Sequence, residues 1–194
     1  MVRAVFLDRD GVINQKAPEG RYVTRWAEVE FLAGGAEAVK RFRSAGFLVV
    51  VVSNQRAVAK GLITEEGLAS LHHRMWKELF GPGKGFDAVY YCPHDTDPPC
   101  RCRKPQPGML LAAAQDRGID LTASWMIGDS ESDVEAGRSA GCRTIQICSP
   151  DVRPSTLADQ VAGSLAEATD VILAAETLGW CSRFKRTHAT CLIS

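Results

Sequence analysis

Two aspartates, Asp8 and Asp10, directly follow an apolar run over residues 5–7, and Gly11 comes next. The run has the character of a buried strand, and the glycine lets the chain turn where that strand ends. In an open α/β sheet, ligands bind beyond the carboxyl ends of the strands, and two carboxylates there can reach one bound phosphate. Charges this close require a cation, and Mg²⁺ prefers hard oxygen ligands. The motif indicates phosphoryl chemistry, although acidic pairs after strands also form helix caps or solvated turns.

A hydroxyl and an amide follow a second apolar run, which covers residues 47–52. Ser53 and Asn54 stand at this point. The Ser53 hydroxyl and nearby backbone N–H groups can hold a phosphate oxygen. Because Ser-Asn is also common in turns and at helix starts, a purely structural role is an equally good interpretation of these two residues taken alone.

A further carboxylate, Asp129, follows the apolar run over residues 125–127, and Asp133 comes four residues later. At the switch point of a parallel sheet, this strand would lie beside the one that ends at Asp8, so a metal shared by Asp8 and Asp129 is geometrically reasonable. Asp133 is expected to orient the loop. The alternatives are a first-turn acid that interacts favourably with the helix dipole and a direct contact with the metal.

Lys104 supplies a cation in the loop Arg103-Lys104-Pro105. A phosphoryl-transfer site needs such a charge to offset the charge that develops on the transferred group. A lysine in a loop is ordinarily solvated surface, so the residue alone indicates little. The order along the chain is more specific, because Asp-x-Asp, serine, lysine and Gly-Asp-x-x-x-Asp each come at or just after the end of a predicted strand.

Three thiols and one imidazole gather in the short stretch of residues 92–102. They are Cys92, His94, Cys100 and Cys102. This set suits tetrahedral Zn²⁺, and because protein would fill all four positions the site would be structural. Zinc would pin a loop too small to have its own core and would deliver Arg103 and Lys104 to the phosphate site. A disulfide or buried free thiols are the alternatives.

Apolar runs alternate with helix-like periodic stretches, which predicts an α/β fold with a parallel sheet flanked by helices. Strands are predicted at residues 2–7, 47–52, 88–91, 125–127 and 144–148, and helices at 36–45, 64–80, 107–117, 131–140 and 165–176. His72 and His73 are expected at the surface of the second helix or as cap residues, and not as metal ligands. Residues 1–176 would form one domain, and residues 177–194 a flexible tail.

Charge and composition exclude several classes of protein. Lys and Arg number 23 against 23 Asp and Glu, which argues against a nucleic-acid partner. The seven cysteines are odd in number and Met1 leads directly into a charged strand, so we expect a cytoplasmic protein without disulfides. The longest apolar run, residues 47–52, is too short to cross a membrane. A monomer is expected.

In their order, the four motifs resemble those of the haloacid-dehalogenase-like phosphatases, over roughly residues 1–176. The resemblance implies a Rossmann-like three-layer sandwich with a mostly parallel central sheet and no large cap domain. The zinc-bound loop would be a small addition to this fold. We expect an open site that admits small sugar phosphates.

The same resemblance implies a role for each motif residue. Asp8 would be the nucleophile that forms an aspartyl phosphate, and Asp10 the general acid and base. Mg²⁺ would be held by Asp8, Asp129 and the backbone carbonyl of Asp10. Ser53 and Lys104 would hold the phosphoryl oxygens.

The zinc loop joined to Arg-Lys-Pro resembles the histidinol-phosphatase-like branch, which contains heptose bisphosphate phosphatases and histidinol-phosphate phosphatases. Tyr22-Val23 and the stretch over residues 104–109 resemble the heptose members more. That likeness implies removal of the 7-phosphate from a heptose 1,7-bisphosphate, with histidinol phosphate as the alternative substrate. It also implies that Arg103, assisted by Asn54, recognises the substrate.

Two departures from the heptose pattern bear on the substrate. Arg56-Ala57 stands where those enzymes tend to carry Ser-Gly, and Ser130 stands where they commonly carry lysine. Arg56 could meet a distal phosphate. Two interpretations outside the hydrolases remain: a phosphoacceptor, which would not need Asp10, and a zinc-binding interaction module, which would not explain Asp8.

Overall fold

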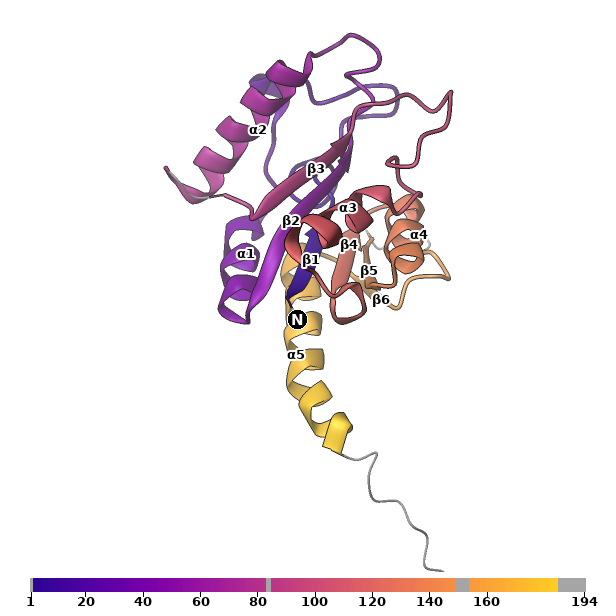
Figure 1. Ribbon diagram of the computed structural model, residues 1–194. Helices are drawn as coiled ribbons and strands as arrows, with labels where there is room; N and C mark the ends of the chain where they lie inside the picture. Colours follow the sequence, from indigo (N-terminus) through magenta and orange to yellow (C-terminus); the bar gives the residue numbers. More distant parts are fainter. Residues whose placement is uncertain (1, 83–84, 149–153, 185–194) are drawn as a thin grey trace, which may run out of the picture.

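The computed structural model describes residues 2–82, 85–148 and 154–184. Within these residues, six strands form one sheet in the order β3-β2-β1-β4-β5-β6, and every pairing is parallel (Figure 1). The strands are β1 (Arg3–Leu7), β2 (Phe47–Asn54), β3 (Ala88–Cys92), β4 (Trp125–Gly128), β5 (Arg143–Ile147) and β6 (Gln160–Ala162). The parallel α/β sheet predicted from the sequence is confirmed.

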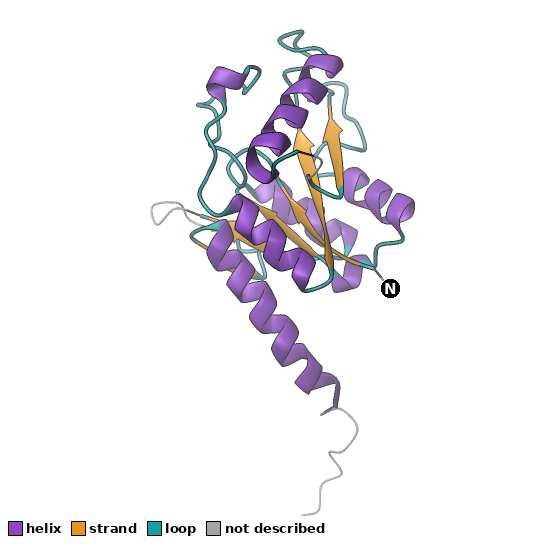
Figure 2. Cartoon of the chain, turned by 90° about the vertical axis from the view of Figure 1, so that its left-hand side faces the viewer, coloured by secondary structure: helices purple, strands orange, loops and turns teal. Residues whose placement is uncertain are grey.

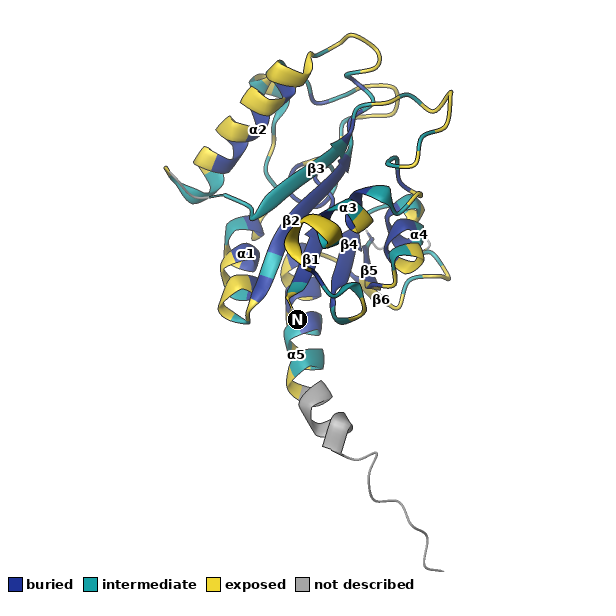
Figure 3. Cartoon of the chain, in the orientation of Figure 1, coloured by how far each residue is buried: buried dark blue, intermediate teal, exposed yellow. Residues whose placement is uncertain are grey.

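Helices cover both faces of the sheet and complete the three layers. The long helices are α1 (Gly35–Ser44), α2 (Glu65–Phe80), α3 (Gly108–Arg117), α4 (Glu131–Ala140) and α5 (Leu165–Phe184), with short 3-10 turns η1 (Trp26–Glu28) and η2 (Leu121–Ala123). Helices α1, α2 and α5 contribute to the core on one face, and α3 and α4 to the core on the other. Figure 3 shows the central strands β1, β2 and β4 mostly buried and the edge strand β3 half-buried, whereas the outer sides of the helices are exposed.

Alternating side chains explain why the sheet is buried on both faces. Along β1, Val5 and Leu7 join the core under α1 and α5, whereas Ala4 and Phe6 join the core under α3 and α4. The register pairs Leu7 with residues of both β2 and β4. The strand order therefore reverses at β1, and the residues just after β1, β2 and β4 meet at one edge.

The long loops lie at this carboxyl edge. Residues 8–34 connect β1 to α1, and residues 93–107 connect β3 to α3. In Figure 2 the strand arrowheads point toward these loops. No further folded unit interrupts the described part of the chain between the motifs, as predicted. None of the described helices combines the length and apolarity that a bilayer span requires.

The structure differs from the sequence predictions at two elements. Strand β6 was not predicted, because it has only three residues and two of them are exposed. Helix α5 continues past residue 176 to Phe184, so the predicted tail begins as helix. The remainder of that tail, residues 185–194, lies outside the described residues.

Candidate active site

Three carboxylates meet at the carboxyl edge of the central strands. Asp8 follows β1, Asp129 follows β4, and Asp133 lies in the first turn of α4. One oxygen from each lies within 4.8 Å of the others. The Asp8 backbone N–H donates to Ile127 O at 2.9 Å, so strand pairing fixes where the first two side chains begin. This arrangement of hard oxygen donors suits a divalent cation.

Lys104 faces these carboxylates from the loop before α3. Its Nζ lies 2.8 Å from Asp8 Oδ1 and 2.5 Å from Asp133 Oδ1, and it donates to Val52 O at 2.8 Å. Burial alone would lower the pKa of Lys104, but the carboxylates of Asp133 and Asp8 more than offset this and raise it. The side chain is therefore a buried, charged ammonium group directed at the site.

Burial and neighbouring carboxylates raise the pKa of Asp8, and Lys104 offsets only part of this rise. Burial raises the pKa of Asp8 to about 7, Lys104 opposes the rise, and the carboxylates of Asp133 and Asp10 add to it. A free carboxylate here would be partly protonated at neutral pH. A bound divalent cation would restore the ionised form, which a nucleophile requires.

Asp129 provides the observation that tests whether a metal fits. Its Oδ1 is buried and has no hydrogen-bond partner among the described residues, while its Oδ2 pairs with Lys16 Nζ at 2.7 Å. Gly11 leaves room for this carboxylate: its φ is +89°, and a Cβ there would lie 2.4 Å from Asp129 Oδ2. An orphaned buried carboxylate oxygen beside Asp8 fits the donor set that Mg²⁺ takes.

Asp10 stands apart from the carboxylate cluster. Its side chain pairs with Arg9 at 2.8 Å, and it also accepts from Asn14 Nδ2 at 2.8 Å and from Gln55 Nε2 at 3.2 Å. Gln55 Nε2 donates as well to Ser53 Oγ, at 2.8 Å. Asp10 and Ser53 are thus linked through one amide at the edge of the site.

A cavity of ≈ 330 Å³ opens over these groups. Its lining includes Asp8, Asp10, Ser53, Lys104 and Asp129, together with Asn54 and Arg103. A neighbouring cavity of ≈ 750 Å³ runs along the loop of residues 15–25 and shares Lys16, Arg21 and Tyr22 with the first. The structure therefore places the predicted catalytic residues and two of the predicted substrate residues around one open space.

The predicted substrate residues differ in how they are used. Both polar atoms of the Asn54 side chain contact the Lys104 backbone, since Oδ1 accepts from its N–H at 3.0 Å and Nδ2 donates to its carbonyl at 3.1 Å. Asn54 therefore fixes the lysine loop. Arg103 is exposed to the cavity apart from a long contact to His94 O. Arg56 does not line the cavity, because its guanidinium pairs with Asp95.

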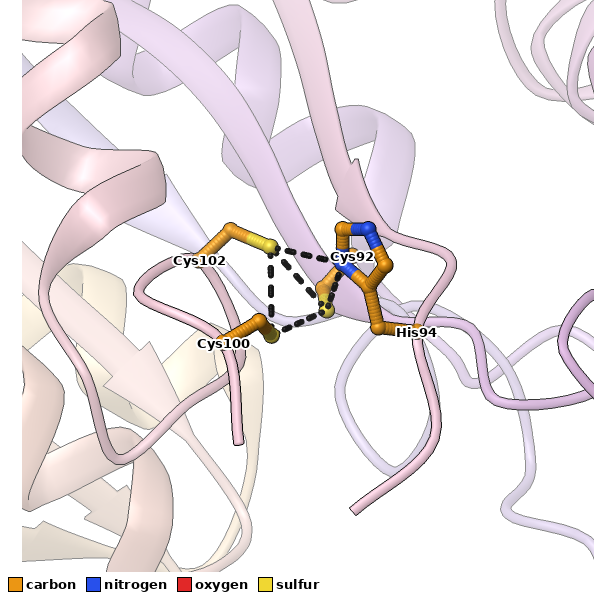
Figure 4. Close-up of side chains that lie close together, drawn as sticks. All are labelled: Cys92, His94, Cys100 and Cys102. Carbon is orange, nitrogen blue, oxygen red and sulfur yellow. Dashed lines mark hydrogen bonds between the residues drawn. The ribbon is translucent and has the colours of Figure 1, made fainter. Parts of the chain in front are cut away.

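The four candidate zinc ligands come together at the end of β3 and in the loop that follows it (Figure 4). The three sulfurs are 3.2 to 3.5 Å apart, and His94 Nδ1 lies 3.1 Å from Cys102 Sγ and 3.6 Å from Cys92 Sγ. Ligands at zinc–sulfur distances would be separated by about 3.8 Å in a tetrahedron. The side chains therefore enclose a space of nearly the right size for one Zn²⁺ ion, and their chemistry suits it.

Backbone contacts connect the zinc loop to the active site. Gln55 N–H donates to Cys92 O at 2.8 Å, and Ala59 N–H donates to Pro93 O at 3.0 Å. Against the effect of burial, the backbone N–H of Arg103 helps to lower the pKa of Cys100 to about 6. The loop that carries the thiols is thus hydrogen-bonded on one side to the Ser53 segment and on the other to the Arg103 segment.

Sequence reasoning missed several residues of the site. The expectation of a surface position for His72 is wrong: the ring is buried and contacts Arg9, which is itself buried. The apolar spacing of α2 could have revealed this, because position 72 falls on the same face as Leu68 and Met75. Lys16 lies in an irregular loop and no sequence signal pointed to its contact with Asp129.

Comparisons with known proteins cover nearly the whole chain. The HAD-hydrolase-like family model matches residues 101–168. The D-glycero-beta-D-manno-heptose-1,7-bisphosphate 7-phosphatase of Yersinia pestis is 37% identical over 185 residues, which are 89% of this chain and 96% of that protein. The enzyme of the same name from Escherichia coli K12 is 36% identical over 182 residues, 88% of this chain and 94% of that protein.

One of the solved structures that match is the D,D-heptose 1,7-bisphosphate phosphatase of B. bronchiseptica in complex with magnesium and phosphate. The two share a TM-score of 0.79 and 31% sequence identity, over 90% of this chain and 99% of that one. A HAD-like phosphatase from Mesorhizobium loti also matches, with a TM-score of 0.73 and 29% identity over 91% of this chain and 87% of that one.

Proposed function

Since this chain belongs to the D-glycero-D-manno-heptose-1,7-bisphosphate 7-phosphatase family of HAD-like hydrolases, we propose that it removes the 7-phosphate from that heptose bisphosphate. The observation that carries the proposal is the meeting of Asp8, Asp129 and Lys104 at the carboxyl edge of the sheet. These are the groups that phosphoryl transfer through an enzyme carboxylate requires.

In the first half of the reaction, an Asp8 carboxylate oxygen attacks phosphorus and forms the aspartyl phosphate. The bond from phosphorus to the sugar oxygen breaks, its electron pair stays on that oxygen, and Asp10 donates the proton that makes the sugar hydroxyl. Lys104, held 2.8 Å from Asp8, offsets the charge of the phosphoryl oxygens. Ser53, which lines the same cavity, donates a hydrogen bond to one of them.

In the second half, a water oxygen attacks phosphorus and Asp10 takes the proton from that water. The bond between phosphorus and the Asp8 oxygen breaks, which releases inorganic phosphate and restores the carboxylate. Asp10 is suited to both proton transfers. Its side chain lines the cavity beside Asp8, and it lies outside the cluster of carboxylates that would bind the metal.

Mg²⁺ would be held by Asp8, Asp129 and the backbone carbonyl of Asp10, and would supply positive charge to the phosphoryl group. Buried Asp133 pairs with Lys104 and fixes its direction. Zn²⁺ held by Cys92, His94, Cys100 and Cys102 would be structural. We place the enzyme in the cytoplasm as a monomer, with residues 1–176 as its phosphatase domain.

Arg103 is proposed to recognise the second phosphate of the substrate, because its guanidinium lines the cavity and has no carboxylate partner among the described residues. Asn54 would assist by holding the backbone of Lys104, the next residue. The relatives support a heptose substrate and give the histidinol-phosphate alternative no support.

A substrate panel tests the proposal. The protein is incubated with Mg²⁺ and heptose 1,7-bisphosphate, fructose 1,6-bisphosphate or histidinol phosphate, and inorganic phosphate is measured. We expect kcat/KM for the heptose to exceed that for the others by about tenfold or more. Faster hydrolysis of histidinol phosphate would overturn the substrate. Phosphoprotein that accumulates without turnover would indicate a phosphoacceptor, and zinc binding with neither reaction an interaction module.

A further inference from the structure

The general acid and base is held by a buried arginine. Arg9 is only 1% exposed. Its Nη2 donates to both oxygens of Asp10, at 2.9 and 2.8 Å, and its Nε donates to Oδ1 at 3.1 Å. A guanidinium with this two-oxygen contact fixes the orientation of a carboxylate as well as its position.

The third nitrogen of Arg9 contacts a histidine from a distant helix. Arg9 Nη1 lies 3.1 Å from Nε2 of His72, which is on α2 and 5% exposed. A guanidinium can only donate hydrogen bonds, so Nε2 of His72 accepts and the ring proton sits on Nδ1. Burial, together with the positive charge of Arg9, lowers the pKa of His72 to about 3, so the ring stays neutral at physiological pH.

Packing holds the His72 ring in the orientation that this contact needs. The ring stacks on Trp76 with centroids 5.4 Å apart and planes at 19°, and it meets the edge of Tyr91 at 6.2 Å. The two aromatic side chains belong to Trp76 on α2 and Tyr91 on β3, and neither residue lines the cavity over Asp8 and Asp10. His72 thus links the packing of the outer helix to the guanidinium.

We infer that His72 is a positioning residue for catalysis: it holds Arg9, and Arg9 holds the Asp10 carboxylate where it exchanges protons with the leaving group and the attacking water. The inference rests on the proposed function. Asn14 and Gln55 also donate to Asp10, so loss of the His72 acceptor is expected to loosen the carboxylate without releasing it.

Two substitutions separate the acceptor from the ring. His72→Phe keeps a ring that can stack on Trp76 but removes the acceptor, whereas His72→Gln keeps an acceptor at about the place of Nε2 but removes the ring. His73→Phe is the matched control, because His73 is the exposed neighbour on the same helix. Melting temperature and circular dichroism establish that each variant is folded.

The measurement uses the Mg²⁺- and Zn²⁺-loaded enzyme in excess over 4-nitrophenyl phosphate, so that a single turnover is followed. Release of 4-nitrophenol follows the first step, which needs no proton from Asp10 because the leaving group is stable as an anion. Release of inorganic phosphate follows the second step, which needs Asp10 as base. Steady-state turnover of the heptose bisphosphate is measured beside it.

In His72→Phe we expect phosphate release to slow by about tenfold while 4-nitrophenol release stays within about twofold of wild type. Heptose bisphosphate turnover should fall by about tenfold in kcat with little change in KM. His72→Gln and His73→Phe should behave as wild type in both steps. In this pattern the rate of phosphate release depends on the hydrogen-bond acceptor at position 72 and not on the packing of the ring.

Other patterns overturn the inference. Equal slowing of both steps in His72→Phe, unchanged or faster phosphate release there, or loss of activity in His72→Gln with retention in His72→Phe would each show that the ring only packs. The proposed function fails separately, since wild-type enzyme that releases no phosphate at all is not a phosphatase, and the inference then falls with it.

Discussion

The two candidate metal sites are assembled in opposite ways. The carboxylates come from the ends of two strands and the start of a helix, with Asp8 far in sequence from Asp129 and Asp133, whereas the four candidate zinc ligands come from one short stretch of residues 92–102. In both clusters the ligand atoms lie within 4.8 Å of one another. The carboxylate cluster is therefore assembled by the pairing of strands in the sheet, whereas the cysteine and histidine cluster is assembled by the folding of one short segment.

The surroundings of the two clusters differ accordingly. Asp8 and Asp133 are buried beneath the ends of strands whose side chains fill both cores. Of the zinc ligands, only Cys92 is buried, and His94 is exposed. The carboxylates are held by the fold itself, whereas the loop has little packing of its own to hold the thiols. We conclude that the active site should keep its shape without its metal and the cysteine loop should not.

The largest effect on turnover is expected from a substitution of Asp8 that changes the fold little. In Asp8→Asn an amide replaces the nucleophile at constant size, so turnover of heptose bisphosphate should fall by at least ~10³-fold while the melting temperature changes little. Phosphate release and thermal unfolding measure the two quantities. Asp170→Asn is the control, since Asp170 lies exposed on α5. Appreciable activity in Asp8→Asn would refute Asp8 as nucleophile.

The zinc loop should respond in the opposite manner. Cys102→Ser is expected to lose bound zinc, to melt lower by about 5 °C, and to lower kcat/KM by roughly 10- to 100-fold, because Arg103 and Lys104 follow the loop directly. Metal analysis, thermal unfolding and phosphate release measure these changes. Cys142→Ala removes a buried thiol outside the loop and should keep the full zinc content and the activity. Unchanged melting and rate in zinc-free Cys102→Ser would show that the loop is incidental.

The two arginines near the sites allow a finer comparison. Arg103 lines the cavity, whereas Arg56 pairs with Asp95 of the zinc loop. Arg103→Ala should raise KM for heptose bisphosphate by about tenfold, because a charge-assisted contact to a phosphate is lost. Arg56→Ala should change KM by less than about threefold, because Arg56 is held in a partly exposed ion pair outside the cavity. Steady-state kinetics distinguishes them, and a larger KM effect from Arg56 would restore it as a substrate contact.

The sequence predicted those parts of the site that follow strands. Asp8, Ser53 and Asp129 each come directly at or after an apolar run, and in a parallel sheet such positions share one edge, so their meeting could be foreseen. The clustering of the four candidate zinc ligands was predictable for another reason. Their types and short spacing are local properties that do not depend on how the rest of the chain folds.

Contacts between irregular or distant segments could not be predicted in this way. The pairing of Lys16 with Asp129 depends on the path of a loop without periodicity, and the pairing of Arg56 with Asp95 depends on how two loops lie together. The prediction for His72 was wrong because it relied on the polar residue type and disregarded the position of His72 on the apolar face of α2. Helical periodicity was the better guide there, since Leu68 and Met75 on that face are also buried.

The buried histidine also carries an expected effect on stability. His72 has a pKa lowered from 6.5 to about 3 in the folded protein by burial and Arg9, so the unfolded chain binds a proton between these values and the folded chain does not. Stability is therefore fully present above pH 6.5 and is lost as the pH falls toward 3. In that window wild type should lose up to about 1.4 kcal/mol more per pH unit than His72→Gln. Urea unfolding at several pH values between these limits measures the slopes, and His73→Gln should keep the wild-type slope. Parallel slopes for wild type and His72→Gln would mean that His72 is protonated in the folded protein, and a protonated ring could not accept the hydrogen bond from Arg9.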